Sequence, residues 1–245
     1  MEGYSADTYG QIWASIYDDQ WSGVFPVEST VAFLKELAGE GPALELAIGT
    51  GRIALPLKEV GVDVHGIDIS EAMVAKLRTK PGGEDIPVTM GDFADVGVDE
   101  TYPLIYVVFN TFFALTTQEE QIRCFANVAR HLEPGGAFVI ECFVPDLARF
   151  DRHQRVDARR VRVDAVGLEV SRHDPVAQQI TTQIVVLTQE GNQLYPVFIR
   201  YAFPSELDLM ARLAGLRLRA RHGGWDDEPF TSESAAHVSV YELPE

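Results

Sequence analysis

A short stretch at residues 45–57, ELAIGTGRIALPL, constrains the fold of this chain more than any other part of it. Small residues stand at Ala47, Gly49 and Gly51, and apolar residues at helical spacing follow them. Glycine tolerates the left-handed backbone of a tight turn and lets other groups approach the main chain closely. The stretch therefore predicts a strand that turns sharply into a helix beside a ligand.

The same letters fit two nucleotide-binding motifs. Counted from Gly49, the spacing is the G-x-G-x-x-A fingerprint of dinucleotide sites. Counted from Glu45, it matches the E-x-G-x-G-x-G sequence of an S-adenosylmethionine (SAM) site, with Ala47 in place of the first glycine. The two interpretations predict different chemistry, so residues outside the loop have to distinguish them.

Composition excludes several function classes. The 245 residues suit one α/β domain with an insertion. The formal net charge of −17 argues against nucleic acid as a partner, because a negative surface repels phosphate backbones. Cys124, Cys142 and the histidines lack metal-ligand spacing, so we expect no metal, no disulfide and a reducing cytoplasm. No apolar run approaches the ~18 residues of a membrane span, and the N-terminus lacks a secretion signal.

Strand-like apolar runs alternate with helical patterns along most of the chain. Short buried strands that alternate with helices form parallel sheets through right-handed crossovers, so we expect a doubly wound, Rossmann-like α/β fold. The expected helices cover residues 5–19, 28–39, 52–60, 71–79, 117–131 and 206–215. The seven expected strands of the sheet cover residues 43–48, 62–70, 87–93, 104–110, 133–143, 216–225 and 237–243.

The pattern changes after Pro145, where β-rich segments are separated by turn signals. We expect antiparallel strands at residues 159–165, 168–173, 178–188 and 194–203. The chain is thereby divided into three predicted parts: N-terminal helices and a nucleotide-binding core at 1–145, an antiparallel β insert at 146–203, and a final helix with two strands at 204–245. The insert is predicted to be a substrate lid or a dimerisation element.

Acidic residues near the ends of the first three strands distinguish the two motifs. Glu45 stands where a dinucleotide fold normally has only apolar residues. Asp68 closes the second strand, where it suits ribose hydroxyls with either cofactor. Asp92 and Phe93 follow the third strand, where an acid accepts from an adenine amine and an aromatic ring covers the base. In this order, over residues 17–143, the chain resembles the class I SAM-dependent methyltransferases, in particular small-molecule enzymes that tailor sugars and antibiotics.

The resemblance implies a last strand that runs antiparallel, SAM as the cofactor, and a role for each matching residue. The glycine loop would wrap the methionine part of SAM, Asp68 would hold the ribose, Met73 would pack on adenine, and Asp92 would meet the adenine amine beside Phe93. Arg52 suits the SAM carboxylate, and Asn110 lies at a strand end that faces the cleft. The predicted cofactor-binding residues are Tyr17, Glu45, Ala47, Gly49, Gly51, Arg52, Asp68, Ile69, Met73, Asp92, Phe93 and Asn110.

Tyr17 and Glu141 are the predicted catalytic residues. Tyr17 resembles the tyrosine that small-molecule N-methyltransferases fold over the cofactor, although its spacing from Trp13 and Trp21 also fits a core stripe. Glu141 is a carboxylate at the end of the fifth strand, where it would act as a base, as an anchor for a substrate amine, or as a structural hydrogen-bond acceptor.

The function predicted from these residues is transfer of the SAM methyl group to a nitrogen or oxygen of a small molecule. Methyl transfer needs mainly orientation and desolvation of the nucleophile, so no catalytic triad is required. The partners predicted are the small-molecule substrate and a second copy of the chain, but no nucleic acid and no membrane. Two alternatives stay open: a regulatory SAM- or nucleotide-binding protein on the same fold, and an NAD-dependent oxidoreductase.

Overall fold

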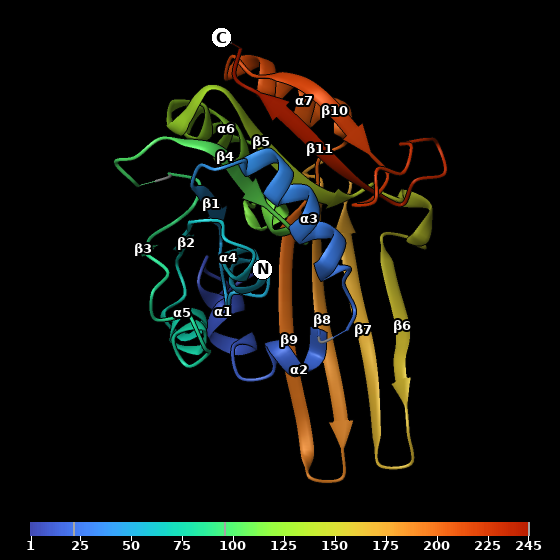
Figure 1. The fold of residues 1–245 in the computed structure, drawn as a ribbon. Coiled ribbons are helices and arrows are strands. Elements are labelled where there is room, and N and C mark those ends of the chain that lie inside the picture. The colour runs from blue at the N-terminus through green and yellow to red at the C-terminus, as the bar shows by residue number, and fades with distance from the viewer. Residues whose placement is uncertain (22, 96, 245) are drawn as a thin grey trace.

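A seven-stranded sheet forms the larger part of the computed structural model (Figure 1), which describes residues 1–21, 23–95 and 97–244. The strand order is β10-β11-β5-β4-β1-β2-β3. The strands are β1 (Ala43–Leu46), β2 (Val64–Asp68), β3 (Val88–Met90), β4 (Tyr102–Val107), β5 (Leu132–Phe143), β10 (Arg217–His222) and β11 (Ala236–Glu242). The strands β1 to β5 pair in parallel, and β11 runs antiparallel to both of its neighbours, β5 and β10. The predicted Rossmann-like fold with an antiparallel last strand is confirmed.

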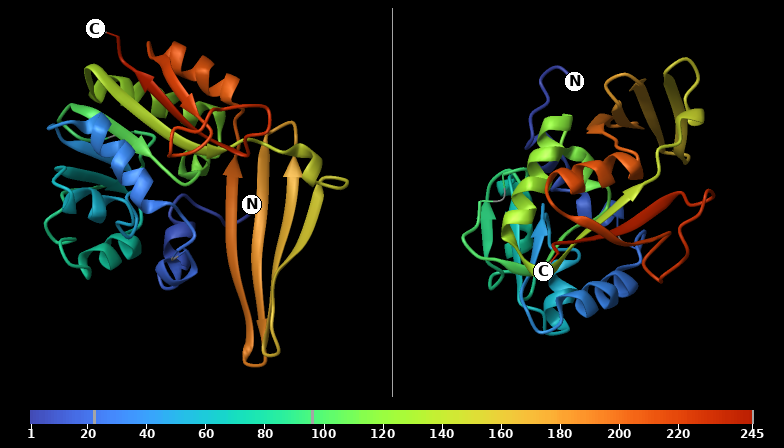
Figure 2. Two further views of the ribbon diagram at one scale, coloured as in Figure 1. Left: turned by 45° about the vertical axis from the view of Figure 1, so that its right-hand side comes forward. Right: turned by 90° about the horizontal axis from the view of Figure 1, so that it is seen from above.

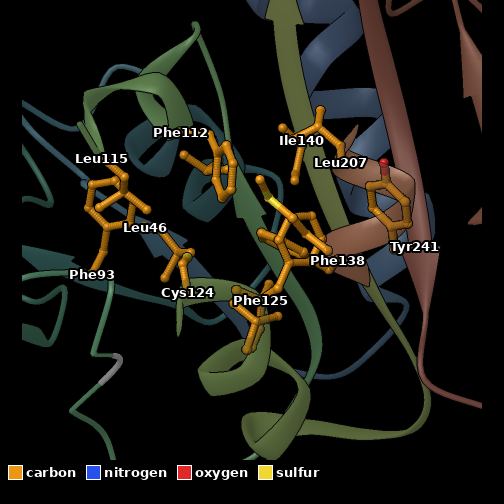
Figure 3. Close-up of a cluster of buried hydrophobic side chains, with 14 of the residues drawn as sticks. Leu46, Phe93, Phe112, Leu115, Cys124, Phe125, Phe138, Ile140, Leu207 and Tyr241 are labelled. Carbon is orange, nitrogen blue, oxygen red and sulfur yellow. The ribbon is translucent and has the colours of Figure 1, made fainter. Parts of the chain in front are cut away.

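Helices cover both faces of this sheet and separate the core into two apolar clusters. They are α3 (Val27–Ala38), α4 (Ala54–Glu59), α5 (Glu71–Arg78), α6 (Gln118–His131) and α7 (Pro204–Leu213). Figure 3 shows the cluster under α6 and α7, in which Phe125 lies edge-on to Phe138 and Tyr241. The other face of β5 presents Ala137 and Val139 to a second cluster that includes residues of α3 and α4. The strand is buried on both faces, as its continuous apolar run predicts.

Side-chain caps fix where two of these helices begin. The Ser70 hydroxyl accepts from the Met73 amide at 3.3 Å and starts α5. Thr117 and Glu120 form the capping box expected from the T-x-x-E spacing and start α6. Because a capped helix begins at a defined residue, the strand ends that precede α5 and α6 are held in register with the sheet.

A four-stranded antiparallel sheet follows β5 in the sequence. Its strands β6 (Gln154–Val161), β7 (Ala165–Asp174), β8 (Gln179–Thr188) and β9 (Gly191–Arg200) pair in the order of the sequence. Figure 2 shows the long strands extending away from the seven-stranded sheet. A strand expected at residues 159–165 is wrong: β6 ends at Val161 and Ala165 already belongs to β7. The alternation of charged and apolar residues continues through the turn between them, so the pattern alone misplaces the turn. The boundaries 146–203 for the insert stay a prediction.

A buried arginine fastens this sheet to the rest of the protein. Arg200, at the end of β9, is 5% exposed. Its guanidinium donates to Gln121 of α6 at 2.6 Å, to Gln178 at 2.9 Å and to Glu206 of α7 at 2.7 Å. A buried charge that makes three hydrogen bonds to three different side chains fixes the geometry of the groups around it. The network therefore sets how the four-stranded sheet meets α6 and α7.

The first helix expected, at residues 5–19, is wrong in its extent. The structure has two short helices instead, α1 (Thr8–Trp13) and α2 (Tyr17–Trp21). The chain folds back between them so that the Trp13 and Trp21 rings stack with centroids 6.0 Å apart. The Trp13 indole also donates to the Pro196 carbonyl of β9 at 3.3 Å. Tertiary contacts of these aromatic side chains override a local pattern that suits one helix.

The helices α1 and α2 lie between α5 and β9, close to the strand ends of the larger sheet (Figure 1). None of the described helices is both long and apolar enough to cross a membrane. The N-terminal helices therefore occupy the region where parallel α/β sheets bind their ligands.

Candidate active site

Most of the predicted site residues meet at the carboxyl edge of the parallel strands. Glu45 lies in β1, Asp68 ends β2, Asp92 follows β3, Asn110 follows β4, and Glu141 is near the end of β5. These strands are neighbours in the sheet, so residues that are up to about a hundred positions apart in the sequence share one edge.

The loop after β1 has the backbone of a tight turn. Ala47, Gly49 and Gly51 have φ values of 57°, 58° and 78°. At Gly51 an added Cβ would lie 2.4 Å from Leu77 Cδ1, so glycine is required there. At Gly49 it would meet only the Ala47 carbonyl, at 3.9 Å, so this face of the loop is open to a ligand. Ala47 adopts a left-handed backbone that costs an L-residue about 1–2 kcal/mol, which explains why the motif usually has glycine there.

Asp68 joins the glycine loop to the second strand. Its Oδ2 accepts from the Gly49 amide at 2.7 Å, and its Oδ1 accepts from the Ser70 amide at 2.8 Å. The carboxylate is buried, and burial raises its pKa although both amides oppose the shift. Each carboxylate oxygen has a further lone pair, which leaves Asp68 able to accept from ribose hydroxyls.

Glu45 is a buried carboxyl with few partners. It is 3% exposed, and its Oε2 accepts from the Tyr106 hydroxyl at 3.0 Å. Burial raises the pKa of Glu45 to about 8, against the opposing effects of the Tyr106 hydroxyl and the Arg52 charge. An isolated carboxylate is unfavourable in an apolar setting, so this position favours a ligand that carries positive charge or donors.

Arg52 lies between two aromatic rings beside Glu45. Its guanidinium carbon is 4.5 Å from the centroid of Phe25 and 4.8 Å from that of Phe109. The buried Arg52 Nε and Trp21 Nε1 have no acceptor among the residues that the structure describes. Buried donors nearly always have an acceptor, so these two fit a ligand that carries oxygen acceptors, such as the carboxylate of SAM.

Tyr17 lies on α2 next to Arg52 and inside the aromatic cluster of α1 and α2. Its ring is edge-on to that of Tyr9, with centroids 6.5 Å apart. Burial raises the pKa of Tyr17 and outweighs the opposing effect of Arg52. The phenol is therefore protonated at neutral pH and available as a donor. Tyr17 packs with the aromatic side chains of α1 and α2, as a core stripe would, and it also lies beside Arg52 and near Glu45, as a cofactor-binding residue would. Its role in the cofactor site stays a prediction.

Ile69, which was predicted to bind the cofactor, and the three residues expected around adenine differ in their exposure. Ile69 is 39% exposed, whereas Met73 is 4% exposed and packs with Trp13 of α1. Phe93 belongs to the core cluster, and Asp92 Oδ1 accepts from the Ala94 amide at 2.8 Å. Of the two apolar residues Ile69 and Met73, Ile69 is the one with surface free for a base. The roles of all four residues in cofactor binding stay predictions.

Asn110 and Glu141 tie the ends of β4 and β5 together. The Asn110 side-chain oxygen accepts from the Phe143 amide at 2.6 Å, and Glu141 Oε2 accepts from the Phe109 amide at 2.7 Å. Both side chains thus have the structural role that was one alternative for Glu141. Glu141 is partly exposed, and Oε1 makes no hydrogen bond within the described part of the chain, which leaves it available for a substrate.

Sequence analysis missed three contacts of this site. Tyr106 binds Glu45, and the signal for it was its position opposite Glu45 in the parallel pairing of β1 with β4. Phe25 and Phe109 hold Arg52, but their spacing in the sequence gives no indication of this contact. Two hollows on the surface, one beside Phe33 and one around residues 78–85, include none of the predicted site residues.

Replacement of Glu45 by Gln is expected to remove a pH dependence from the stability of the ligand-free protein. The pKa of Glu45 rises from 4.5 to about 8 on folding. Protonated Glu45 therefore favours the folded state below about pH 4.5, and this contribution is lost as the pH rises to about 8. The free energy of unfolding of the wild type, minus that of Glu45→Gln, should fall by up to about 1.4 kcal/mol per pH unit in this window.

Urea unfolding of both proteins at a series of pH values measures this difference. Glu119→Gln, an exposed residue of α6, is the control and should parallel the wild type. A difference between wild type and Glu45→Gln that stays constant over the window would contradict the burial of an uncompensated carboxyl.

Known proteins share both the sequence and the fold of this chain. A family model described as a methyltransferase domain matches residues 43–136. The cypemycin N-terminal methyltransferase of a Streptomyces species is 33% identical over 203 residues, which are 81% of this chain and 82% of that protein. The structure of the CcbJ methyltransferase from Streptomyces caelestis has a TM-score of 0.92 at 39% identity, and the match covers 99% of this chain and 100% of that one.

A more distant enzyme has the same fold. The SAM-bound structure of an amino pentose methyltransferase from Micromonospora echinaspora has a TM-score of 0.69 at 20% identity, over 93% of this chain and 96% of that one. With these relatives, the SAM interpretation of the glycine loop holds and the dinucleotide interpretation does not. The chain belongs to the SAM-dependent methyltransferases, and SAM is its cofactor.

Proposed function

We propose that this enzyme transfers a methyl group from SAM to an amine nitrogen of a small molecule. The observation that carries the proposal is the arrangement around Phe109. Arg52 stacks on this ring, Tyr17 lies beside Arg52, and Glu141 binds the Phe109 amide through one carboxylate oxygen. A protonated phenol thus lies beside Arg52, and a carboxylate with a free oxygen binds the backbone of Phe109, the ring on which Arg52 stacks.

The names of relatives support nitrogen rather than oxygen as the acceptor. One relative is named for methylation of an N-terminus, and another, from Streptomyces venezuelae, is an N,N-dimethyltransferase of an amino sugar that is 33% identical over 99 residues. The match to the second covers 40% of each chain. The charge of −17 also favours an amine, because a negative surface attracts cations and repels nucleic acid.

The residues of the chain would act mainly by orientation and desolvation. When bound, SAM supplies a sulfonium methyl group, which passes to the amine as the carbon–sulfur bond breaks and the carbon–nitrogen bond forms. A neutral amine is already nucleophilic, so no strong base is needed before the transfer. Glu141 would accept a hydrogen bond from the amine and direct its lone pair, and the extra proton leaves afterwards to Glu141 or to water. Asp68, Glu45 and Arg52 would hold the cofactor.

The first experiment tests cofactor and acceptor together. Calorimetry should show SAM binding and no NAD binding, and Asp68→Ala should weaken SAM binding by about 1.5–3 kcal/mol through loss of charge-assisted hydrogen bonds. Ser70→Ala, which removes the cap of α5 but keeps the carboxylate, is the control. Mass spectrometry should then show SAM-dependent methylation of peptides with a free N-terminus or of amino sugars, and not of the matched hydroxyl compounds.

Two results would contradict the proposal. Methylation confined to the hydroxyl compounds would make the acceptor an oxygen. Tight SAM binding without turnover on any amine would favour a regulatory protein on this fold.

Substitutions at Tyr17 and Glu141 test their proposed roles. Tyr17→Phe and Glu141→Gln should each lower the methylation rate by about 10- to 1000-fold. Glu141→Gln keeps an oxygen that accepts from the Phe109 amide, so the strand ends stay joined. Its SAM affinity should therefore change less than its rate. Steady-state kinetics and calorimetry measure both quantities, with Glu119→Gln as the control. Wild-type rates in both variants would restrict these residues to structural roles.

We also propose that the enzyme forms a homodimer through the outer face of the four-stranded sheet. Val156 pairs with Val170 across β6 and β7, and Leu168 and Leu194 flank Val185 on β8. Val156, Val170 and Leu194 are 64%, 37% and 56% exposed. The opposite face of the four-stranded sheet packs against α1 through Tyr195. This contact supports the proposal that the face next to α1 forms one wall of the substrate site. The strand β6 carries three arginines and one aspartate, whereas the whole chain has a net charge of −17. The basic strand is therefore complementary in charge to the acidic surface of a second copy, which is the proposed partner.

Light scattering with size-exclusion chromatography tests the dimer. Val156→Glu and Leu194→Glu should give monomers that still bind SAM, because a charge in an apolar interface is costly to desolvate. Val163→Glu, in the exposed turn after β6, is the control and should remain dimeric. A monomeric wild type at micromolar concentration would overturn the proposal.

A reducing cytoplasm is the proposed location of the enzyme. Cys124 and Cys142 are both free and buried, and burial raises the pKa of both thiols. Protonated, buried thiols are inert, which fits a compartment in which disulfides do not form.

A further inference from the structure

We propose that Asp18, Thr50 and Lys80 form a latch that holds α1 and α2 closed over bound SAM and positions Tyr17. The latch goes beyond the proposed acceptor chemistry, because it concerns only the entry and release of the cofactor. Asp18 belongs to α2, Thr50 lies between the two glycines of the cofactor loop, and Lys80 follows α5.

Four contacts join these three parts of the chain. The Thr50 hydroxyl donates to Asp18 Oδ1 at 2.7 Å, and Lys80 Nζ donates to the same oxygen at 2.9 Å. Lys80 Nζ lies 2.8 Å from Asp18 Oδ2 and also donates to the Thr50 carbonyl at 2.7 Å. A single ammonium thus binds both α2 and the glycine loop. Loss of Asp18 would remove every contact of the latch with α2, whereas loss of Lys80 would leave only the Thr50–Asp18 bond.

The latch lies where it would control access to the cofactor site. Glu45 and Asp68 are 3% and 6% exposed while α1 and α2 are in place. Gly10 of α1 packs against Ser70, two residues after Asp68, and Tyr17 of α2 lies beside Arg52 and near Glu45, so we expect opening of these helices to give a ligand access to both carboxyls. Asp18 is also the neighbour of Tyr17, so the bonds that hold α2 to the loop fix the position of the phenol relative to the cofactor. Asp18 is therefore a positioning residue.

The exposure of the latch suits repeated opening. The side chains of Asp18 and Lys80 are 44% and 27% exposed, so water and salt weaken their attraction. Partial burial raises the pKa of Asp18, but hydrogen bonds from Lys80 and Thr50 outweigh it and lower the pKa overall. The carboxylate is thus charged at neutral pH. Contacts of this strength change an opening equilibrium by a few-fold, which is enough to slow release without preventing it.

Release of SAM measures the latch without any acceptor. Trp13 and Trp21 lie on α1 and α2, so their fluorescence is expected to report opening when bound SAM is chased with excess S-adenosylhomocysteine. Asp18→Ala should release SAM about three- to tenfold faster than the wild type. Asp18→Asn keeps an acceptor for Thr50 but loses the charge, and should give a smaller increase. Asp19→Asn removes the same charge from the adjacent exposed residue and should release SAM at the wild-type rate.

Two further measurements separate a latch from a general loss of stability. Raising the salt concentration should speed release from the wild type and leave Asp18→Ala almost unchanged. Hydrogen exchange in residues 8–21 should be faster in Asp18→Ala and, to a smaller extent, in Lys80→Met. The double variant should be no faster than Asp18→Ala, because that substitution already removes every contact of the latch with α2. The latch would be overturned if Asp18→Ala and Asp19→Asn released SAM at equal rates. Additive increases in the hydrogen-exchange rate in the double variant of Asp18 and Lys80 would overturn it as well. No step depends on methyl transfer, so failure to methylate amines would overturn the proposed acceptor alone.

Discussion

The carboxylate of Asp68 is the contact on which the site depends. By accepting the Gly49 amide and the Ser70 amide, it joins the loop after β1 to the start of α5. The loop needs such a partner because three residues in it have a left-handed backbone, one of them an alanine that adopts this conformation at a cost. A buried carboxylate with two amide donors is stable where an unpaired one would not be. The group that shapes the loop is also the one we propose to bind the ribose of SAM, and under that proposal folding and cofactor binding would use one carboxylate.

Candidate site residues also support the fold at the ends of β4 and β5. Asn110 and Glu141 each use one oxygen to bind a backbone amide of the neighbouring strand. Phe109, whose amide Glu141 binds, in turn forms one side of the cage around Arg52. A displacement of Glu141 would therefore move Phe109 and, through it, Arg52. The residue proposed to bind the acceptor and the arginine proposed to bind the cofactor are therefore linked through Phe109.

The fold and much of the site could be predicted because their signals are local. The Ser70 cap and the Thr117–Glu120 box are set by neighbours within a few residues, and the strands of the core are continuous apolar runs. The break between α1 and α2 could not be predicted, because it depends on stacking of Trp13 with Trp21 and on a bond to β9, which is far away in the sequence. The cage of Phe25 and Phe109 around Arg52 and the contact of Asp18 with Lys80 are hidden for the same reason.

Long-range contacts also join the four-stranded sheet to the helices beside the candidate cofactor site. Trp13 of α1 packs against Tyr195 of β9, with ring centroids 5.0 Å apart, and donates to the next residue of that strand. Arg200, at the other end of β9, is fixed to α6 and α7 by its buried network. The strand β9 therefore connects the core of the enzyme to the helices that carry Tyr17. Because the strand is held at Arg200 and contacts α1 at Tyr195 and Pro196, a substrate that rests on the face of this sheet next to α1 would press on the same helices that we propose to close over SAM. Acceptor binding and cofactor retention would then be coupled through one strand.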